Sequence, residues 1–270
     1  MKTRLITAAI GIPFLIFVLV VRGWFAEAVI VVLTLIALDE VYKALAHRGY
    51  SVCRWGGYVA TVLMWPLSRF MGVLDPLLLL VAAMGISMTG VLLNGHPTFP
   101  DAAASLYPLL TCFLPMSMFM MMLNATYGVV PGIALITMAF AIAYSCDGAA
   151  YFGGRTFGRH KLCPQISPKK TVEGALFGLL GGTLGGLACR WVFVCIFRMP
   201  MPGVPAAILL GVLGSLAGQI GDLTASLLKR HSGIKDYGKL FPGHGGVMDR
   251  FDSVIFALIV MYCYTLVLHG

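Results

Sequence analysis

Long hydrophobic segments, separated by short polar ones, run through the whole chain. A membrane-spanning helix needs about 20 mostly apolar residues, because backbone groups in lipid must be hydrogen-bonded within the segment itself. The segments that approach this length are 5–21, 24–38, 56–70, 76–93, 103–123, 129–144, 174–197, 205–228 and 253–268. The segment 56–70 is the weakest, because Pro66 interrupts it. The pattern predicts an all-α polytopic membrane protein with eight or nine transmembrane helices, of which about nine is preferred.

The composition supports a membrane protein. Hydrophobic residues make up 59% of the chain and charged residues 11%, whereas a soluble domain carries about 25% charged residues. The first apolar segment is followed by further spans and by no small-residue cleavage site, so we expect it to be retained as a helix. The seven cysteines are scattered without a Cys-x-x-Cys pair, which disfavours a disulfide framework or a zinc site.

The positive charge is distributed unevenly between the polar segments. If the N-terminus is cytoplasmic, Arg22, Arg69 and Arg198 lie outside and Arg190 lies within a helix. The remaining Lys and Arg residues then lie on the cytoplasmic side, which agrees with the positive-inside rule and supports nine helices independently of hydropathy. The net charge of +8 therefore reflects topology and attraction to membrane lipids, and we expect no nucleic-acid partner.

We predict a single integral membrane domain, 1–270, whose two halves differ in character. Residues 1–140 form a hydrophobic helical half, and residues 141–270 form a catalytic half with two basic, glycine-rich loops, 147–174 and 226–252. Both loops are predicted to be cytoplasmic, so we expect the active site at the cytoplasmic face of the C-terminal half. Small residues along several helices are compatible with a homodimer.

Carboxylates, which are scarce in this chain, gather in and just before the second basic loop. Only 11 residues are acidic, and Asp222, Asp236, Asp249 and Asp252 are among them. Asp222 lies within an apolar segment, where a carboxylate costs about 2.5–3.5 kcal/mol on insertion scales and usually has a partner or a function. Asp249 and Asp252 share one helix face if the last helix begins near Val247.

Two interpretations of these carboxylates remain open. A simple ion pair with Lys229 or Arg250 would explain Asp222, and a favourable helix dipole would explain Asp249 or Asp252 alone. Several carboxylates at a similar depth would, however, repel each other unless a cation lies between them. Ligand sets made of oxygen atoms suit Mg²⁺.

The basic loops combine cations with hydroxyl groups and glycines, as in KKTVEG and KRHSGIKD. Phosphoryl-transfer sites need cations for phosphate oxygens, carboxylates for metal and glycine backbone for close approach. The sequence PGHGG would let backbone N–H groups face an anion, with His244 as a donor or base, although a lone histidine is more often structural. No P-loop or Rossmann spacing is present, so any nucleotide would bind to helix ends and loops.

The stretch 226–252 reads S-x-L-K-R-x4-K-D-x-G-x2-F-P-x-H-G-G-V-x-D-R-F-D. It resembles the signature of the CDP-diacylglycerol synthase (phosphatidate cytidylyltransferase) family. The first basic loop also resembles this family, at Asp147, Ala150, Tyr151, Gly154, Arg155, Phe157, Gly158, Lys161, Leu162, 167–171, Glu173 and Gly174. The resemblance covers the C-terminal half, and residues 1–140 match only as a hydrophobic pattern.

The resemblance implies a reaction of phospholipid biosynthesis in which CTP and phosphatidate give CDP-diacylglycerol and pyrophosphate. The phosphate oxygen of the lipid attacks the α-phosphorus of CTP, and pyrophosphate leaves. The resemblance also implies Mg²⁺, with a monovalent ion such as K⁺ as an optional second ion. The expected location is the bacterial cytoplasmic (inner) membrane, with the N-terminus and both basic loops in the cytoplasm.

The resemblance further suggests roles for individual residues. Asp222 and Asp249 are the first choices as metal ligands, and Asp252 and Asp236 are the second choices. The expected catalytic residues are Asp222, Lys229, Asp249, Arg250 and His244. The expected substrate contacts are Ser167, Lys169, Lys170, Glu173, Ser226, Arg230, Lys235, Gly245 and Gly246. Lys169, Lys170 and Lys229 would contact CTP, and Arg230 and Arg250 the lipid phosphate or pyrophosphate. Replacing Asp222 or Asp249 with Asn is expected to abolish turnover in a protein that remains folded.

Three other classes are compatible with parts of the pattern. A CTP-dependent lipid kinase, or a cytidylyltransferase acting on another lipid phosphate, shares acidic and basic sequences of this kind. A CDP-alcohol phosphotransferase is disfavoured, because the later spaced aspartates of that class do not follow Asp147. An ion-coupled transporter would need no HGG loop and would tend to have paired broken helices in two halves.

Overall fold

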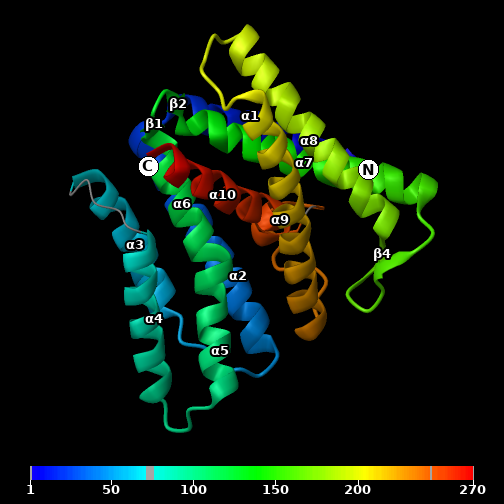
Figure 1. Cartoon of the computed structure of the whole chain (residues 1–270). Helices are drawn as coiled ribbons and strands as arrows, with labels where there is room; N and C mark the ends of the chain where they lie inside the picture. Colours follow the sequence, from blue (N-terminus) through cyan, green and yellow to red (C-terminus); the bar gives the residue numbers. More distant parts are fainter. Residues whose placement is uncertain (1, 71–75, 244, 270) are drawn as a thin grey trace. The chain divides into compact units, whose positions relative to one another are not determined.

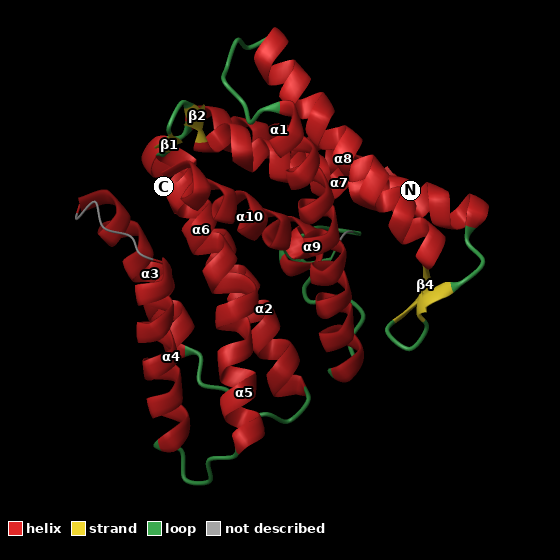
Figure 2. Cartoon of the chain, in the orientation of Figure 1, coloured by secondary structure: helices red, strands yellow, loops and turns green. Residues whose placement is uncertain are grey.

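Helices make up most of the chain in the computed structural model (Figure 2). The structure describes residues 2–70, 76–243 and 245–269. Its helices are α1 (Lys2–Val21), α2 (Gly23–His47), α3 (Trp55–Phe70), α4 (Pro76–Leu92), α5 (Phe99–Pro108), the π-helical turn η1 (Leu109–Phe113), α6 (Leu114–Asn124), α7 (Gly132–Phe157), α8 (Val172–Cys195), α9 (Val204–His231) and α10 (Met248–His269). Strands β1 (Thr126–Tyr127), β2 (Val130–Pro131), β3 (Lys161–Cys163) and β4 (Ser167–Thr171) form two antiparallel pairs. The predicted all-α membrane fold is confirmed.

Every predicted hydrophobic segment coincides with helix over most of its length. Within the described residues, five helical stretches are long and apolar enough to cross a membrane: Phe99–Leu123, Gly132–Phe157, Val172–Cys195, Val204–His231 and Met248–Leu268. Helices α3 and α4 are shorter, with 16 and 17 residues, and α2 contains Glu27, Asp39 and Glu40. The chain is therefore a polytopic membrane protein, and the count of nine spans stays a prediction.

Helices α7 and α9 are among those that continue beyond the hydrophobic segments that predict them. Helix α7 extends to Phe157 and α9 extends to His231. The prediction that 147–157 and 229–231 belong to loops is therefore wrong. Hydropathy marks the part of a helix that lipid covers, whereas the helix itself can continue into water. Arg155, Lys229 and Arg230 favour this continuation, because cations near a helix C-terminus interact well with its dipole.

The chain forms two compact units. The first unit is Met1–Met121 with Leu228–Phe251, and the second unit is Met122–Leu227 with Asp252–Gly270. Helices α9 and α10 each contribute residues to both units. Most of the signature stretch 226–252 therefore belongs to the same unit as the N-terminal helices. The description of the chain as one domain stays a prediction.

In the first unit, α3 and α4 lie side by side, and α2 and α5 pack against them (Figure 1). Tyr42, Met64, Leu109 and Phe113 are fully buried between these helices. Pro108 lies where α5 passes into η1. A proline lacks the N–H that an α-helix needs and crowds the preceding turn, which accounts for the change in helical register there. The buried Tyr42 anchors the C-terminal part of α2, which carries Glu40.

In the second unit, α7 and α8 pack closely along their length. Gly178, Gly182 and Gly186 recur every fourth residue of α8 and are buried. A Cβ at Gly182 would collide with Ser215 Oγ, and one at Gly178 would lie 3.1 Å from Cys146 Sγ. Small residues at this spacing allow helices to approach closely in a membrane. This approach fixes the positions of the polar residues at the end of α7.

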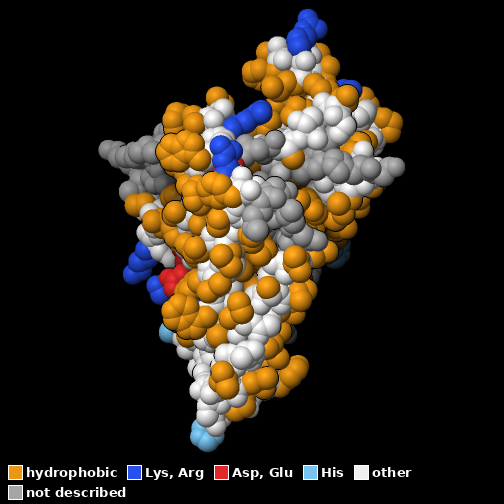
Figure 3. All heavy atoms as spheres, turned by 90° about the vertical axis from the view of Figure 1, so that its left-hand side faces the viewer, with side chains coloured by type: hydrophobic (Ala, Val, Ile, Leu, Met, Phe, Trp, Pro, Cys, Tyr) orange, Lys and Arg blue, Asp and Glu red, His pale blue; other side chains and the backbone are white. Residues whose placement is uncertain are grey.

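Hydrophobic side chains dominate the face of the molecule drawn in Figure 3. Large apolar side chains on the helices are exposed, including Leu78, Leu180 and Leu184 at 65%, 63% and 65%. A soluble monomer rarely exposes contiguous apolar surface on this scale. Lipid is the environment that such helix faces fit.

Candidate active site

A pocket of about 460 Å³ lies in the second unit. Helix α7 contributes Asp147 and Arg155 to its lining, β4 contributes Lys169 and Lys170, and α9 contributes Asp222. The pocket therefore brings together charged residues of the first predicted basic loop and Asp222, which precedes the second loop. Cations beside carboxylates are the combination that binds phosphate groups with a metal ion.

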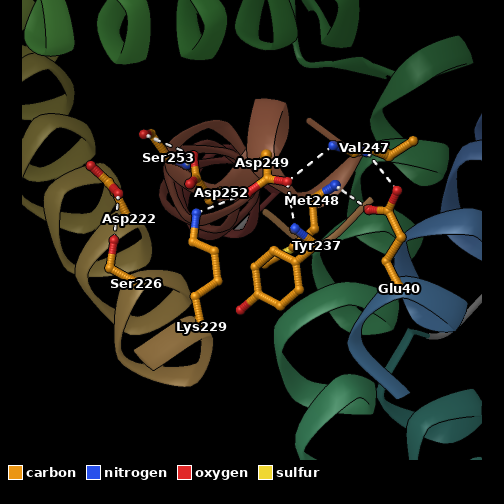
Figure 4. Close-up of polar contacts among 11 residues, drawn as sticks. Glu40, Asp222, Ser226, Lys229, Tyr237, Val247, Met248, Asp249, Asp252 and Ser253 are labelled. Atoms are coloured by element: carbon orange, nitrogen blue, oxygen red, sulfur yellow. Dashed lines mark hydrogen bonds and ion pairs between the residues drawn. The ribbon is translucent and has the colours of Figure 1, made fainter. Parts of the chain in front are cut away.

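Lys170 and Asp222 form an ion pair in this pocket. Lys170 Nζ lies 2.5 Å from Asp222 Oδ2, and the two side chains are 28% and 26% exposed. Asp222 also accepts a hydrogen bond from Ser226 Oγ at 3.3 Å, one turn further along α9 (Figure 4). The partner of Asp222 is thus a lysine of the first basic loop. The alternative interpretation, a simple ion pair with Lys229 or Arg250, is wrong for Lys229, which pairs with Asp249.

The β3–β4 hairpin and the start of α8 hold Lys169 and Lys170 at the pocket. Thr171 caps α8, because its side chain accepts the N–H of Gly174 at 3.1 Å. The carboxylate of Glu173 accepts the backbone N–H groups of Arg159 and His160 at 3.0 and 3.2 Å, and lies 2.6 Å from His160 Nδ1. Glu173, predicted to contact substrate, thus holds the start of the hairpin against α8. Ser167, predicted likewise, pairs with Cys163 in the hairpin.

Asp147 is a pocket carboxylate that the sequence placed in the family resemblance, and with Asp222 as a coupling carboxylate in the transporter alternative, but not among the predicted site residues. Ser253 Oγ, from α10, donates a hydrogen bond to Asp147 Oδ2 at 3.0 Å. The same hydroxyl lies 3.4 Å from Asp252 Oδ1, and the backbone N–H of Ser253 donates to that oxygen at 2.9 Å. Ser253 therefore links Asp147 and Asp252. The signal for Asp147 was present, since it is an aspartate at the end of an apolar segment, as Asp222 is.

Asp249 and Lys229 form a second ion pair, in the first unit. Lys229 Nζ lies 2.8 Å from Asp249 Oδ1, and the side chains are 14% and 3% exposed. The other oxygen, Asp249 Oδ2, accepts the N–H groups of Tyr237 and Gly246 at 2.7 and 3.0 Å (Figure 4). Lys229 Nζ also lies 5.4 Å from the centre of the Tyr237 ring, within range of a cation–π interaction.

The glycine-rich turn before α10 is therefore held by hydrogen bonds from its backbone to the Asp249 carboxylate. Gly245 adopts a φ of 86°, a left-handed conformation that favours glycine. The prediction that backbone N–H groups of this turn face an anion holds for Gly246, but the anion is the carboxylate of Asp249 in the same chain. His244, predicted as a catalytic residue, lies outside the described residues.

Glu40 is a further buried carboxylate in contact with this turn. Its two oxygens accept the backbone N–H groups of Val247 and Met248 at 3.0 and 2.9 Å (Figure 4). Burial raises the pKa of the Glu40 carboxyl above its usual range, and the two hydrogen bonds act in the opposite direction. Sequence reasoning missed this residue, because no spacing relates it to a contact 207 residues away.

The remaining predicted site residues lie at the surface. Arg230, Lys235, Asp236 and Arg250 are exposed. Among the described residues, no three His, Cys, Asp or Glu side chains converge as a preformed metal site. Mg²⁺ in phosphate sites, however, usually takes one or two protein carboxylates and completes its shell with phosphate oxygens and water. Asp147 and Asp222 in the pocket fit that mode of binding.

The long apolar helices and the pocket define a polytopic membrane protein with a cavity lined by both cationic and acidic side chains. The chain belongs to the cytidylyltransferase family, whose family model matches residues 2–268. The resemblance seen in the signature stretch is thereby confirmed, and the protein is an enzyme of the nucleotidyltransferase class.

Individual relatives carry a more specific name. The phosphatidate cytidylyltransferase of Synechocystis sp. is 30% identical, over 98% of this chain and 96% of its own. That of Staphylococcus haemolyticus is 33% identical over 96% of each chain. That of Bacillus subtilis is 41% identical over 131 residues, which are 48% of this chain and 47% of its own. Two of these matches extend over almost the whole length of both proteins.

Proposed function

We propose that the protein is a phosphatidate cytidylyltransferase. The phosphate oxygen of phosphatidate forms a bond to the α-phosphorus of CTP, the bond to the β-phosphate breaks, and pyrophosphate leaves with its electron pair. The observation that carries this proposal is the pairing of Lys170 with Asp222 at 2.5 Å in a pocket of a membrane protein. The pairing joins the first basic loop to the aspartate that precedes the second one, and two relatives that match almost the whole chain bear this name.

Cations of the pocket would bind the triphosphate of CTP. Lys169, Lys170 and Arg155 line the cavity from one side, and Lys170 is already held by a carboxylate. An incoming phosphate would replace Asp222 as the partner of Lys170, and Asp222 could then bind a metal ion. Mg²⁺, when bound, would neutralise charge on the attacking and leaving oxygens. The attacking phosphate is a monoester that is already mostly ionised near neutral pH, so the reaction needs no general base.

Asp249 and Lys229 form the buried ion pair of the first unit. Both were predicted as catalytic residues, and a role of Asp249, Asp252 or Asp236 as metal ligand stays a prediction. Arg230 and Arg250, whose side chains are exposed, stay the predicted contacts of the lipid phosphate or of pyrophosphate. K⁺ as a second ion and a homodimeric assembly also stay predictions.

The products of the reaction test this function. Detergent-purified protein supplied with CTP, phosphatidate and Mg²⁺ is expected to release pyrophosphate only when phosphatidate is present. Release of CDP together with a phosphorylated lipid alcohol would instead identify a CTP-dependent lipid kinase. Pyrophosphate release with a different lipid phosphate, and none with phosphatidate, would identify a cytidylyltransferase of another lipid. Folded protein that releases neither product would contradict the proposal and reopen the transporter class.

We propose further that the site faces the cytoplasm from a bacterial inner membrane. Loops rich in Lys and Arg usually lie on the cytoplasmic side of a membrane, and both predicted loops of the catalytic half are basic. Sealed inner-membrane vesicles test this orientation. Inside-out vesicles are expected to consume added CTP, and right-side-out vesicles are expected to do so only after detergent opens them. Equal rates in the two intact preparations would contradict the orientation.

A further inference from the structure

Glu40 lies at the C-terminal part of α2 and contacts the turn that leads into α10. Its carboxylate is the acceptor for two successive backbone N–H groups, those of Val247 and Met248. The residue is 7% exposed and has no cationic partner among its described contacts. A carboxylate at a helix N-terminus is stabilised by the helix dipole, which here offsets part of the cost of burial.

Two glycines of the signature stretch leave the space that the Glu40 carboxylate occupies. A Cβ at Gly246 would collide with both carboxylate oxygens of Glu40, and a Cβ at Gly238 would collide with Oε1. Glycine at these positions therefore allows a side chain of α2 to come close to the backbone of the signature stretch. The turn thus has two anionic anchors, since Asp249 binds Tyr237 and Gly246 while Glu40 binds the next two residues.

The same part of the chain also holds the other end of this loop. His47 Nδ1 lies 3.0 Å from the backbone oxygen of Ser232, and Tyr50 Oη lies 2.9 Å from His231 Nε2. Helix α2 and the turn after it therefore contact the loop at its beginning and at its end. Among these contacts of α2, that of Glu40 lies nearest to Asp249 in sequence. Glu40 accepts the N–H of Val247, and the preceding N–H, that of Gly246, donates to Asp249.

We propose that Glu40 is a positioning residue for the cytidylyl transfer reaction, an inference that rests on the proposed function. It fixes the backbone of Val247 and Met248, and thereby fixes the position of Asp249 in the first turn of α10 and of Lys229, which pairs with Asp249. It does not touch substrate. The hydrophobic N-terminal half therefore contributes to catalysis through Glu40, because this side chain holds the turn that precedes α10. Misplacement of catalytic groups by about 1 Å can cost 10²-fold in rate.

The test compares Glu40→Gln with Glu27→Gln. Glutamine at position 40 offers one acceptor oxygen where the structure uses two, so kcat for pyrophosphate release is expected to fall about 10- to 100-fold, with a much smaller change in the KM for CTP. Glu27 is a matched control, because it is also a buried carboxylate of α2 and accepts a hydrogen bond from Trp65 Nε1 at 3.0 Å. Glu27→Gln keeps that acceptor and is expected to retain near-normal kcat.

Hydrogen exchange provides a readout besides activity. The amides of Val247 and Met248 are expected to exchange faster in Glu40→Gln than in the unmodified protein, and at an unchanged rate in Glu27→Gln. If Glu40→Gln does not fold, Glu40→Asp decides by the same two measurements, because it keeps the charge but is one methylene too short to reach both amides.

A double variant separates positioning from general stability. Alanine at Gly246 would displace the Glu40 carboxylate, so Glu40→Gln is expected to lower kcat little further in a Gly246→Ala background. Additive effects of the two substitutions, an unchanged kcat in Glu40→Gln, or an equal loss in Glu27→Gln would overturn the proposal. Absence of pyrophosphate release by the unmodified protein would contradict the proposed function instead, and the exchange rates of Val247 and Met248 would still report on the anchor.

Discussion

Replacing Asp222 with Asn is expected to lower kcat for cytidylyl transfer by at least about 10²-fold, the range seen when one electrostatic contact to a transition state is removed. The substitution keeps the shape of the side chain and removes its charge. Asp222 lines the pocket and is held by Lys170, from which an incoming phosphate would release it. The measurement is pyrophosphate release across a range of Mg²⁺ concentrations, and a rightward shift of the Mg²⁺ dependence would accompany any residual activity.

The same substitution is expected to leave the protein folded. The Lys170 and Asp222 side chains are about a quarter exposed, and exposed ion pairs contribute about 0–1 kcal/mol to stability. Asp39→Asn is a matched control, because Asp39 pairs with Lys43 at the same distance of 2.5 Å and is 33% exposed, but lies outside the pocket. It is expected to have near-normal kcat.

A double variant distinguishes a role in catalysis from simple charge neutralisation. If Asp222 only balances the charge of Lys170, the double substitution Asp222→Asn with Lys170→Gln should recover turnover. If both residues act on substrate or metal, the double variant should be no more active than either single one. Near-normal turnover in Asp222→Asn itself would remove Asp222 from the site.

The sequence predicts the helices well because lipid imposes a simple requirement on them. Stretches such as 205–228 must satisfy their backbone internally, so their apolar character alone identifies α9. The ends of the helices are not predicted in this way, since the last residues of α7 and α9 leave the lipid and become polar. Hydropathy therefore placed the first basic region entirely in a loop, whereas Asp147 and Arg155 lie on α7.

The candidate site is predicted in its composition but not in its pairings. Asp222, Lys170, Lys229 and Asp249 were all identified from unusual charge in an apolar chain. Which lysine meets which carboxylate depends on packing of distant segments, and the structure pairs Lys170 with Asp222 and Lys229 with Asp249. Glu40 is the extreme case, because its partners lie 207 and 208 residues away. A local pattern carries no information about such a contact.

Asp249→Asn is expected to reduce both stability and turnover, in contrast to Asp222→Asn. The carboxylate uses one oxygen for Lys229 and the other for two backbone N–H groups. An amide has one acceptor oxygen, so either Lys229 or the two N–H groups would face an NH₂ group. Because the pair is buried, removal of one partner is expected to cost about 3–5 kcal/mol. The expectation from sequence that this variant stays fully folded is therefore revised by the contacts of Asp249.

Combining Asp249→Asn with Lys229→Met separates the two losses. The double variant removes the unpaired buried cation, so the thermal unfolding temperature in detergent is expected to recover most of the way towards that of the unmodified protein. Turnover is expected to stay at least about 10²-fold low if Lys229 and Asp249 act on phosphate and metal. Recovery of turnover together with stability would show that the pair only holds the glycine-rich turn. Such a result would leave the chemistry to the pocket of Asp147, Lys170 and Asp222, since those side chains do not depend on the Lys229–Asp249 contact for their own hydrogen bonds and ion pair.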